Sequence, residues 1–118
     1  MVSKALVAAS TKPMILSILL SGESYGYQII QKVKELSGGQ ITWSDGMLYP
    51  VLHRLEKSNL ISSRWSLSDE GRRRKYYSIT TAGREALILD KQEWTQVHDV
   101  LASLWRGVSD GRLYPAGA

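Results

Sequence analysis

Four consecutive cations stand before two tyrosines in the stretch SDEGRRRKYYSIT, residues 68–80. The cations are Arg72, Arg73, Arg74 and Lys75. Guanidinium and ammonium groups bind phosphate oxygens. Residues 54–75 hold seven cations and three anions, and this difference of +4 equals the net charge of the whole chain. A basic patch confined to such a short stretch predicts a polyanionic partner. The alternative is that these charges are solvated residues at the tip of a hairpin.

The other reactive residue types offer little support for catalysis. The two histidines, His53 and His98, fall in different expected helices, and neither has a second ligand at metal-binding spacing. The chain contains no cysteine, so disulfides and thiolate metal sites are excluded, and it has no glycine-rich phosphate loop. The sequence therefore predicts no enzyme activity, no cofactor and no metal site.

The length of 118 residues fits one domain with a modest core, which often gains further burial by oligomerising. No apolar run approaches the roughly 18 residues needed to cross a membrane. The N-terminal stretch MVSKALVAAST lacks the apolar region and cleavage site of a signal peptide. We therefore expect a soluble, cytoplasmic protein without a membrane partner.

The basic stretch must be positioned by its neighbours, and two helices are expected first. Residues 12–20 are apolar, with weaker helical character back to about Lys4. Pro13 then either lies in the first turn of a short helix or bends a longer one. Ser24 is the expected N-cap of the second helix, and the glycine pair at 38–39 ends it.

A third helix is expected from Ser44, its N-cap, to about Ser58, with Asn59 as a left-handed C-terminal residue. Its apolar stripe consists of Met47, Leu48, Val51, Leu52 and Leu55. The period then changes to two, which predicts strands over residues 60–68 and 74–80 joined by a turn at 68–71. Thr80 is expected to cap a long helix over about 81–104.

Three helices followed by a two-stranded hairpin predict a winged helix-turn-helix. The fold class is mainly α with a small β-hairpin, plus a long C-terminal dimerisation helix. We expect a DNA-binding domain over residues 1–80, the dimerisation helix over 81–105 and a disordered tail over 106–118. The cations would then lie at the wing tip near the phosphate backbone, and Trp65, Tyr76 and Tyr77 would attach the wing to the body.

The first turn of the third helix is expected to face the major groove of double-stranded DNA. The candidate contacts there are Ser44, Asp45, Gly46, Tyr49, Pro50 and His53. Tyr49 lies off the apolar stripe, so it can donate to a phosphate or lie against a thymine methyl group. Packing on the wing is the alternative for Tyr49. Pro50 is tolerable if the helix effectively begins near Met47.

The last helix carries a heptad-like pattern. Its two series are Leu87, Trp94 and Leu101, and Asp90, Val97 and Leu104. Alternating steps of three and four predict a seam for a partner helix. Because Asp90 is charged and Trp94 is bulky, this seam suits a cavity better than a dry interface. The alternative is that Trp94 is an ordinary core residue.

Three stretches, GESYGYQIIQKVKE, MLYPVLHRLEKSNLISS and GRRRKYYSITTAGREAL, resemble the PadR family of transcriptional regulators over about residues 6–105. With one helix after the wing, the chain is similar to the short branch typified by the multidrug regulator LmrR. The resemblance implies a homodimeric repressor whose C-terminal helices pair. It also implies a flat interface cavity flanked by one tryptophan from each subunit, and Trp94 stands at the matching position.

The resemblance and the heptad-like spacing of the last helix together predict two sets of residues for these roles. The ligand-binding set is Leu6, Ala9, Pro13, Ser17, Ala86, Leu87, Asp90, Trp94 and His98. The dimer-interface set is Leu87, Trp94, Val97, Leu101 and Leu104. Pro13 and Asp90 depart from the LmrR-like pattern. The expected ligand is planar and aromatic or cationic, while a repressor without a cavity and a winged helix that binds protein remain the alternatives.

Overall fold

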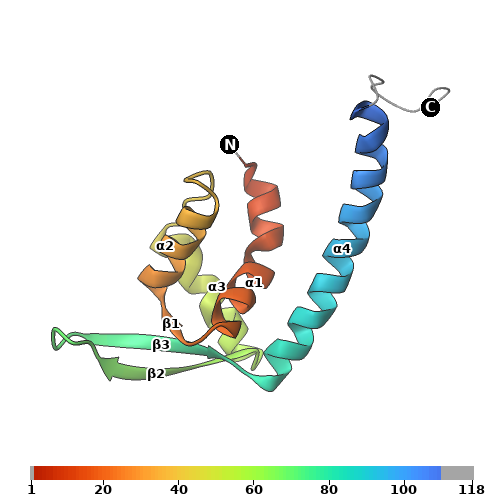
Figure 1. The fold of residues 1–118 in the computed structure, drawn as a ribbon. Coiled ribbons are helices and arrows are strands. Elements are labelled where there is room, and N and C mark those ends of the chain that lie inside the picture. The colour runs from red at the N-terminus through yellow and green to blue at the C-terminus, as the bar shows by residue number, and fades with distance from the viewer. Residues whose placement is uncertain (1, 110–118) are drawn as a thin grey trace. The chain divides into compact units, whose positions relative to one another are not determined.

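A computed structural model describes residues 2–109 of the chain, and side chains as far as residue 106. It divides into two compact units, the first ending at Leu87 and the second beginning at Ile88. The first unit contains three helices that lie on one side of a small sheet, beyond which a hairpin projects (Figure 1). The fold class expected from the sequence is confirmed.

Helix α1 spans Lys4–Leu20 and is the longer of the two expected forms. Ser3 caps it, because its hydroxyl accepts a hydrogen bond from the Leu6 N–H at 3.2 Å. Pro13 lies inside the helix and removes one backbone donor there. The buried side of the second half, including Ile15 and Leu16, belongs to the core of the first unit.

Helix α2 spans Gly26–Leu36, and the expectation that Ser24 caps it is wrong. Ser24 and Tyr25 instead form a short strand, β1 (Ser24–Tyr25). Their partners in the sheet are Tyr77 and Tyr76. The backbone at this point is extended and makes sheet hydrogen bonds, which local capping preferences do not reveal. Tyr25 stands at the N-cap position without a side-chain cap bond.

Helix α3 spans Asp45–Lys57 and follows the predicted pattern closely. The Met47 N–H donates to the Ser44 hydroxyl at 3.2 Å, so Ser44 is confirmed as the N-cap. Asn59 has the expected left-handed backbone, with φ of 62°. We expected the helix to begin near Met47, which would place Pro50 in its first turn. The helix instead begins at Asp45, two residues earlier, so Pro50 lies within it. Both Pro50 and Gly46 are exposed, so water can reach the Gly46 carbonyl that Pro50 leaves without a donor.

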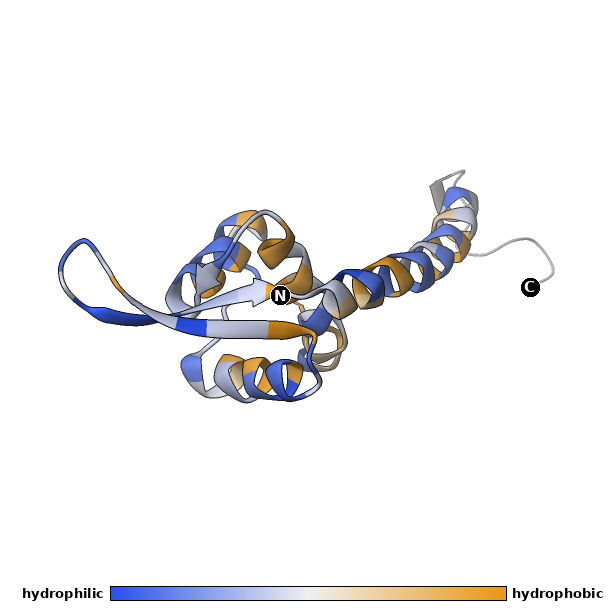
Figure 2. Cartoon of the chain, turned by 90° about the horizontal axis from the view of Figure 1, so that it is seen from below, coloured by the Kyte–Doolittle hydropathy of each residue, from blue (hydrophilic) through white to orange (hydrophobic). Residues whose placement is uncertain are grey.

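Strands β2 (Ile61–Leu67) and β3 (Arg73–Ile79) form the expected antiparallel hairpin. β1 adds a third strand, in the order β1-β3-β2. The Ser68 N–H donates to the Arg72 carbonyl at 2.7 Å, and Gly71 has φ of 81°, which closes the turn. Figure 2 shows that the hairpin is largely hydrophilic toward its tip.

The wing attaches to the body through fewer aromatics than we expected. Tyr77 is buried in the core, and Tyr76 packs edge-to-face on Tyr25 with ring centroids 5.5 Å apart. Trp65 is 57% exposed, so its assignment to the attachment was wrong. Strand alternation places Trp65 on the same face as the buried Ile61, but this face is no longer covered at Trp65.

Helix α4 spans Thr81–Ser109, so it continues beyond the expected end near residue 104. Residues 106–109 of the expected tail are therefore helical, and residues 110–118 lie outside the described part of the chain. Thr80 caps the helix as predicted, accepting from the Gly83 N–H at 3.0 Å. Its hydroxyl also donates to the Asn59 carbonyl at 2.7 Å, which joins the start of α4 to the end of α3.

The start of α4 lies unusually close to the loop before β2, and Gly83 makes this possible. A Cβ atom at Gly83 would overlap the Leu60 carbonyl oxygen and lie 2.8 Å from Ile79 Cγ1. The glycine therefore has a packing role that outweighs its low helix propensity.

We expect Gly83→Ala to lower the free energy of unfolding by about 1–3 kcal/mol, because the backbone must move to accommodate the methyl group. Gly46→Ala in α3 is the matched control, since its Cβ would meet nothing closer than 4.0 Å. The control should keep or raise stability, as alanine favours helices. Urea unfolding of both variants measures the difference, and equal stability of the two would contradict the close approach.

Candidate nucleic-acid interface

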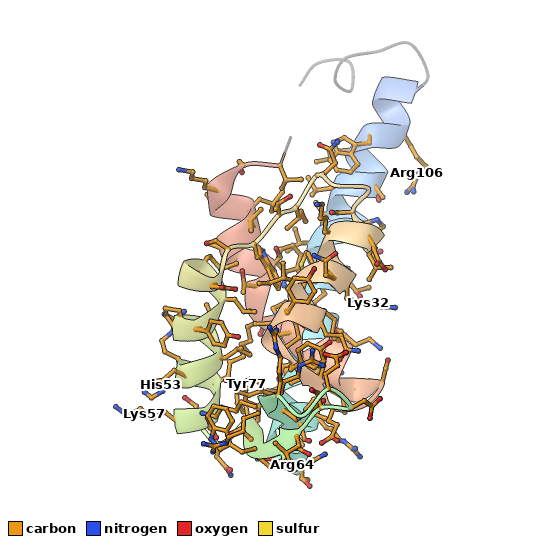
Figure 3. All side chains as sticks on the ribbon, turned by 90° about the vertical axis from the view of Figure 1, so that its left-hand side faces the viewer. Lys32, His53, Lys57, Arg64, Tyr77 and Arg106 are labelled. Atoms are coloured by element: carbon orange, nitrogen blue, oxygen red, sulfur yellow. The ribbon has the colours of Figure 1, made fainter. Side chains whose placement is uncertain are left out.

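The outer face of α3 is exposed as predicted. Ser44, Gly46, Tyr49, Pro50 and His53 all reach solvent, while the stripe of Leu48, Leu52 and Leu55 is buried. Figure 3 shows His53 and Lys57 pointing outward from this helix. The burial of one stripe therefore orients every candidate contact of the helix away from the core.

Tyr49 lies against the first residue of α2. A Cβ at Gly26 would meet Tyr49 Cζ at 2.8 Å, so only glycine leaves room for the phenol ring. Burial raises the pKa of Tyr49, and the negative charge of Asp45 raises it further. The hydroxyl thus stays protonated and can donate a hydrogen bond, while 45% of the residue remains exposed. Sequence reasoning missed Gly26, whose only signal was the adjacent pair of tyrosines in SYGY.

Aromatic rings support three of the four wing cations. The Arg73 guanidinium carbon lies 4.6 Å from the ring centroid of Trp65. Arg74 lies 4.4 Å from the ring of Tyr25, and Lys75 Nζ lies 5.7 Å from that of Tyr77. Such contacts are attractive, and they restrict the long side chains to few conformations. Of these three rings, only Tyr77 belongs to the tyrosine pair that follows the cations in the sequence, whereas Trp65 and Tyr25 come from the neighbouring strands β2 and β1.

Two of the four wing cations form ion pairs with carboxylates, and the other two do not within the described residues. Arg74 pairs with Glu70 at 3.7 Å, and Lys75 Nζ lies 3.7 Å from Glu56 Oε1. Within residues 2–106, neither Arg72 nor Arg73 has a carboxylate within ion-pair distance. The charge that remains available to a phosphate is therefore greatest at Arg72 and Arg73.

Two acidic residues join the wing to the rest of the first unit. Glu23, just before β1, accepts two hydrogen bonds from the Arg64 guanidinium, one of them 3.0 Å long from Nε. These bonds lower the pKa of Glu23 and raise that of Arg64. Glu56 on α3 accepts from the Ser63 hydroxyl on β2 and pairs with Lys75 on β3. The wing is thus held by side chains from both sides.

A cleft of about 720 Å³ brings these parts together. Its lining residues are Tyr25, Gly26, Tyr27, Tyr49, Trp65, Arg72, Arg73, Arg74, Lys75 and Tyr77. Tyr49 and the four wing cations, all predicted contacts, therefore line one concave surface. Ser44, Gly46, Pro50 and His53 are exposed but lie outside this lining.

The predicted dimer and ligand residues fall on both units. Leu6, Ala9 and Ser17 are exposed on α1, and Pro13 is partly buried. Trp94, Val97, Leu101 and Leu104 are exposed on the second unit, and so is His98, whose Nδ1 lies 3.6 Å from Asp99 Oδ1. Because the α1 set and the set from Asp90 onward belong to different units, a shared cavity stays a prediction.

Leu87 is a correction to both predicted sets. It is 3% exposed and packs in the core of the first unit, with the partly buried Ala86 against that core. The heptad count was continued one step too far toward the N-terminus, where the helix packs on its own unit. A side chain already buried there is not available to a partner helix or a ligand.

Within residues 2–109, no helix is long and apolar enough to cross a membrane. The same part of the chain has no group of three or more histidine, cysteine or acidic side chains arranged to hold a metal ion.

Comparison with known proteins gives a consistent result. The model of the transcriptional regulator PadR-like family matches residues 15–88. The chain is 37% identical over 109 residues to the transcriptional regulator Rv3488 of Mycobacterium tuberculosis, covering 92% of each. A PadR-like transcriptional regulator from Bacillus cereus has a similar structure, with a TM-score of 0.78, 33% identity and coverage of 88% of this chain and 99% of that one.

A PadR family regulator from Clostridium difficile is also similar, with a TM-score of 0.73 and 36% identity, covering 81% of this chain and 98% of that one. The matched region includes α2, α3, the wing and the first turns of α4. The chain therefore belongs to the PadR-like family of transcriptional regulators.

Proposed function

We propose that this regulator is a cytoplasmic, homodimeric repressor that binds a double-stranded DNA operator through α3 and the wing. The observation that carries the proposal is the cleft in which Tyr49 and four cations face one another. An exposed helix face suits the major groove, and cations beside it suit the flanking phosphates. The alternative of a protein-binding winged helix would favour an apolar contact surface, whereas this cleft is lined by four cations.

Pairing of α4 helices is the proposed basis of the dimer. Trp94 and Leu101 are each 37% exposed, and Val97 and Leu104 are exposed as well. Their spacing of three, four and three residues places them along one stripe of the helix. Burying such a stripe against a second copy removes apolar area from water, which is favourable.

We further propose that the paired helices hold a planar, cationic small molecule that relieves repression. Two copies of Trp94 across a two-fold axis would enclose a flat ring, since aromatic rings stack favourably. Asp90 precedes Trp94 by about one helical turn, so its carboxylate would attract a cation. Such a ligand weakens repression to the extent that it prefers the free shape over the DNA-bound shape.

The double variant Arg72→Ala/Arg73→Ala should weaken binding to operator and random DNA alike, since phosphates carry no sequence information. Each lost phosphate contact should lower the salt slope by about 0.9. Lys32→Ala/Lys34→Ala, which removes the same charge from exposed positions of α2, is the control and should keep the slope. An unchanged slope in the wing variant would show that the wing does not contact DNA. The operator sequence needed for this assay is identified by sequencing the DNA fragments that the purified protein retains.

Tyr49→Phe removes only the hydroxyl group. If that group donates to DNA, operator affinity should fall by about tenfold, the value of one hydrogen bond to a charged group. An equal loss on random DNA would indicate a phosphate contact, and a loss confined to the operator would indicate a base contact. The unfolding midpoint should stay the same because Tyr49 is half exposed. A large drop in that midpoint would identify Tyr49 as a packing residue instead.

Trp94→Ala should abolish most binding of planar cationic dyes while the protein stays dimeric. Dye binding is followed by quenching of tryptophan fluorescence, and the dimer by sedimentation. Trp65→Ala on the wing is the matched control and should bind dye like the wild type. Asp90→Asn should weaken cationic dyes more than neutral ones. Dissociation of the Trp94 variant, together with a wild type that binds no dye, would make Trp94 a plain interface residue.

A further inference from the structure

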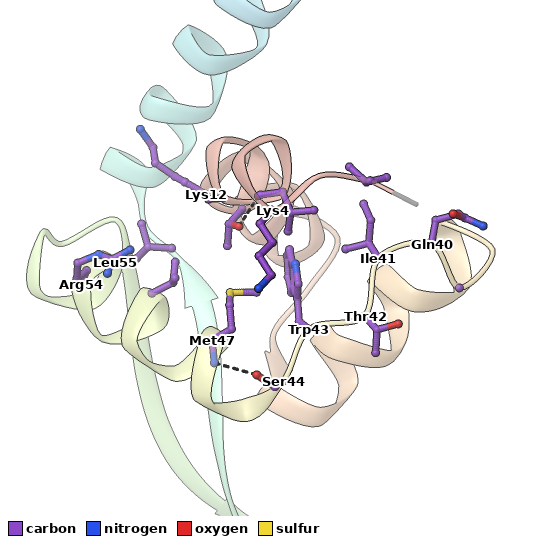
Figure 4. Close-up of a pocket in the computed structure, with 16 residues that line it drawn as sticks. Lys4, Lys12, Gln40, Ile41, Thr42, Trp43, Ser44, Met47, Arg54 and Leu55 are labelled. Carbon is purple, nitrogen blue, oxygen red and sulfur yellow. Dashed lines mark hydrogen bonds between the residues drawn. The ribbon is translucent and has the colours of Figure 1, made fainter.

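A second cavity of about 850 Å³ lies in the first unit and shares no lining residue with the cleft that Tyr49 and the wing cations line. It is bounded by the N-terminal half of α1, the segment 39–44 and α3 (Figure 4). Its lining includes neither Asp90 nor Trp94, the α4 residues proposed to bind the planar cation. Any ligand here would therefore occupy a site independent of Trp94.

The apolar part of the lining is mostly aliphatic. Val7, Ile41, Met47 and Val51 are partly buried and pack against the core, and Leu55 belongs to it. These side chains offer a floor that favours an alkyl chain by removing it from water. Trp43 is the one aromatic residue in the lining.

Trp43 has a buried hydrogen-bond donor without an acceptor among the described residues. It is 4% exposed, and its Nε1–H has no acceptor within the described part of the chain. A buried indole donor usually has a partner, because losing water without replacement costs free energy. In Figure 4 the indole ring lies between Ile41 and the extended side chain of Lys4. A ligand oxygen in the groove would supply an acceptor for this N–H after a small movement of the Lys4 or Ile41 side chain.

The charged groups of the lining are all positive. Lys4, Lys12 and Arg54 contribute to it, and no aspartate or glutamate does. Within residues 2–106, no carboxylate lies within ion-pair distance of Lys4 or Arg54, whereas Lys12 has an interaction of its own. A cavity of this kind attracts anions.

We propose that this groove binds a single-chain aliphatic anion, such as a medium-chain carboxylate. The alkyl chain lies on the aliphatic floor, the head group pairs with Lys4 beside the indole ring, and one oxygen accepts from Trp43 Nε1–H. Arg54 adds positive charge to the same groove. A second copy of α4 is a weaker candidate, because its stripe of Trp94, Val97 and Leu101 is apolar and the one carboxylate of the same heptad pattern, that of Asp90, does not match the three cations of the lining.

The groove also reaches the start of α3, the helix that carries the proposed DNA contacts, so the following step rests on the proposed function. Ser44, the N-cap of α3, and Met47 both contribute to its lining. Tyr49 follows two residues later on the outer face. An occupant that repositions the first turn of α3 would therefore alter how Tyr49 meets DNA, which makes the groove a candidate effector site.

Calorimetric titration of the full chain with octanoate and with octanamide tests the charge requirement. The two probes share the alkyl chain and differ in head-group charge. We expect the wild type to bind octanoate about tenfold more tightly than octanamide, as charge-assisted contacts are the stronger ones. Lys4→Gln/Arg54→Gln should lose this preference, while Lys32→Gln/Lys34→Gln, a charge-matched control on α2, should keep it.

Two further variants locate the site. Trp43→Phe should weaken octanoate binding several-fold by removing the donor, and Trp94→Ala should leave it unchanged. If Trp43→Phe does not fold, the surface pair at Lys4 and Arg54 still decides the outcome. Equal affinity for the two probes, loss of binding in Trp94→Ala, or no binding to the wild type would each overturn the proposal. The last result, combined with a weaker dimer in Lys4→Gln/Arg54→Gln, would assign the groove to a second copy of the chain.

Discussion

Burial of one stripe of α3 is the constraint on which the rest of the first unit depends. Leu48 and Leu52 are fully buried against core residues of α1, α2 and β2, so the helix cannot rotate without exposing them. Because side chains on opposite faces of a helix are linked rigidly, the same burial holds Tyr49 and His53 toward the outside. The proposed DNA contacts therefore gain their direction from a hydrophobic interaction in which they take no part.

The wing hairpin carries cations whose side chains are held in place by aromatic rings. Aromatic rings beneath Arg73, Arg74 and Lys75 limit the freedom of these side chains, so less conformational entropy remains to be lost on binding. Glu56 and Glu70 offset part of the charge, and they are the same groups that join or order the hairpin. The arrangement leaves the strongest uncompensated charge at Arg72 and Arg73, next to the turn.

Helix α4 changes its role along its length. At Leu87 it packs in the core of the first unit, and beyond Ile88 it carries large apolar side chains that stay exposed in the single chain. A helix with a stripe of this kind is more stable when a partner covers it. This exposure is what the proposed pairing of two α4 helices requires, because it leaves an apolar stripe that lies apart from α3 and the wing.

Much of the fold could be predicted from the sequence because the signals are local. The Ser44 cap, the left-handed Asn59, the change to period two at residue 61 and the Thr80 cap each depend on a few neighbouring residues, and the structure confirms them. The basic stretch, the stripe of α3 and the family resemblance likewise predicted which surface carries Tyr49 and the cations.

Tertiary structure alone decided the features that join distant segments. Ser24 and Tyr25 form a strand because β3 lies beside them, which no local preference for capping could indicate. Gly26 and Gly83 are required by the approach of Tyr49 and of the Leu60 carbonyl, and Leu87 is buried because α4 first packs on its own unit. Local pattern determines which element forms and which face is apolar, whereas the packing of the whole chain determines what each face meets.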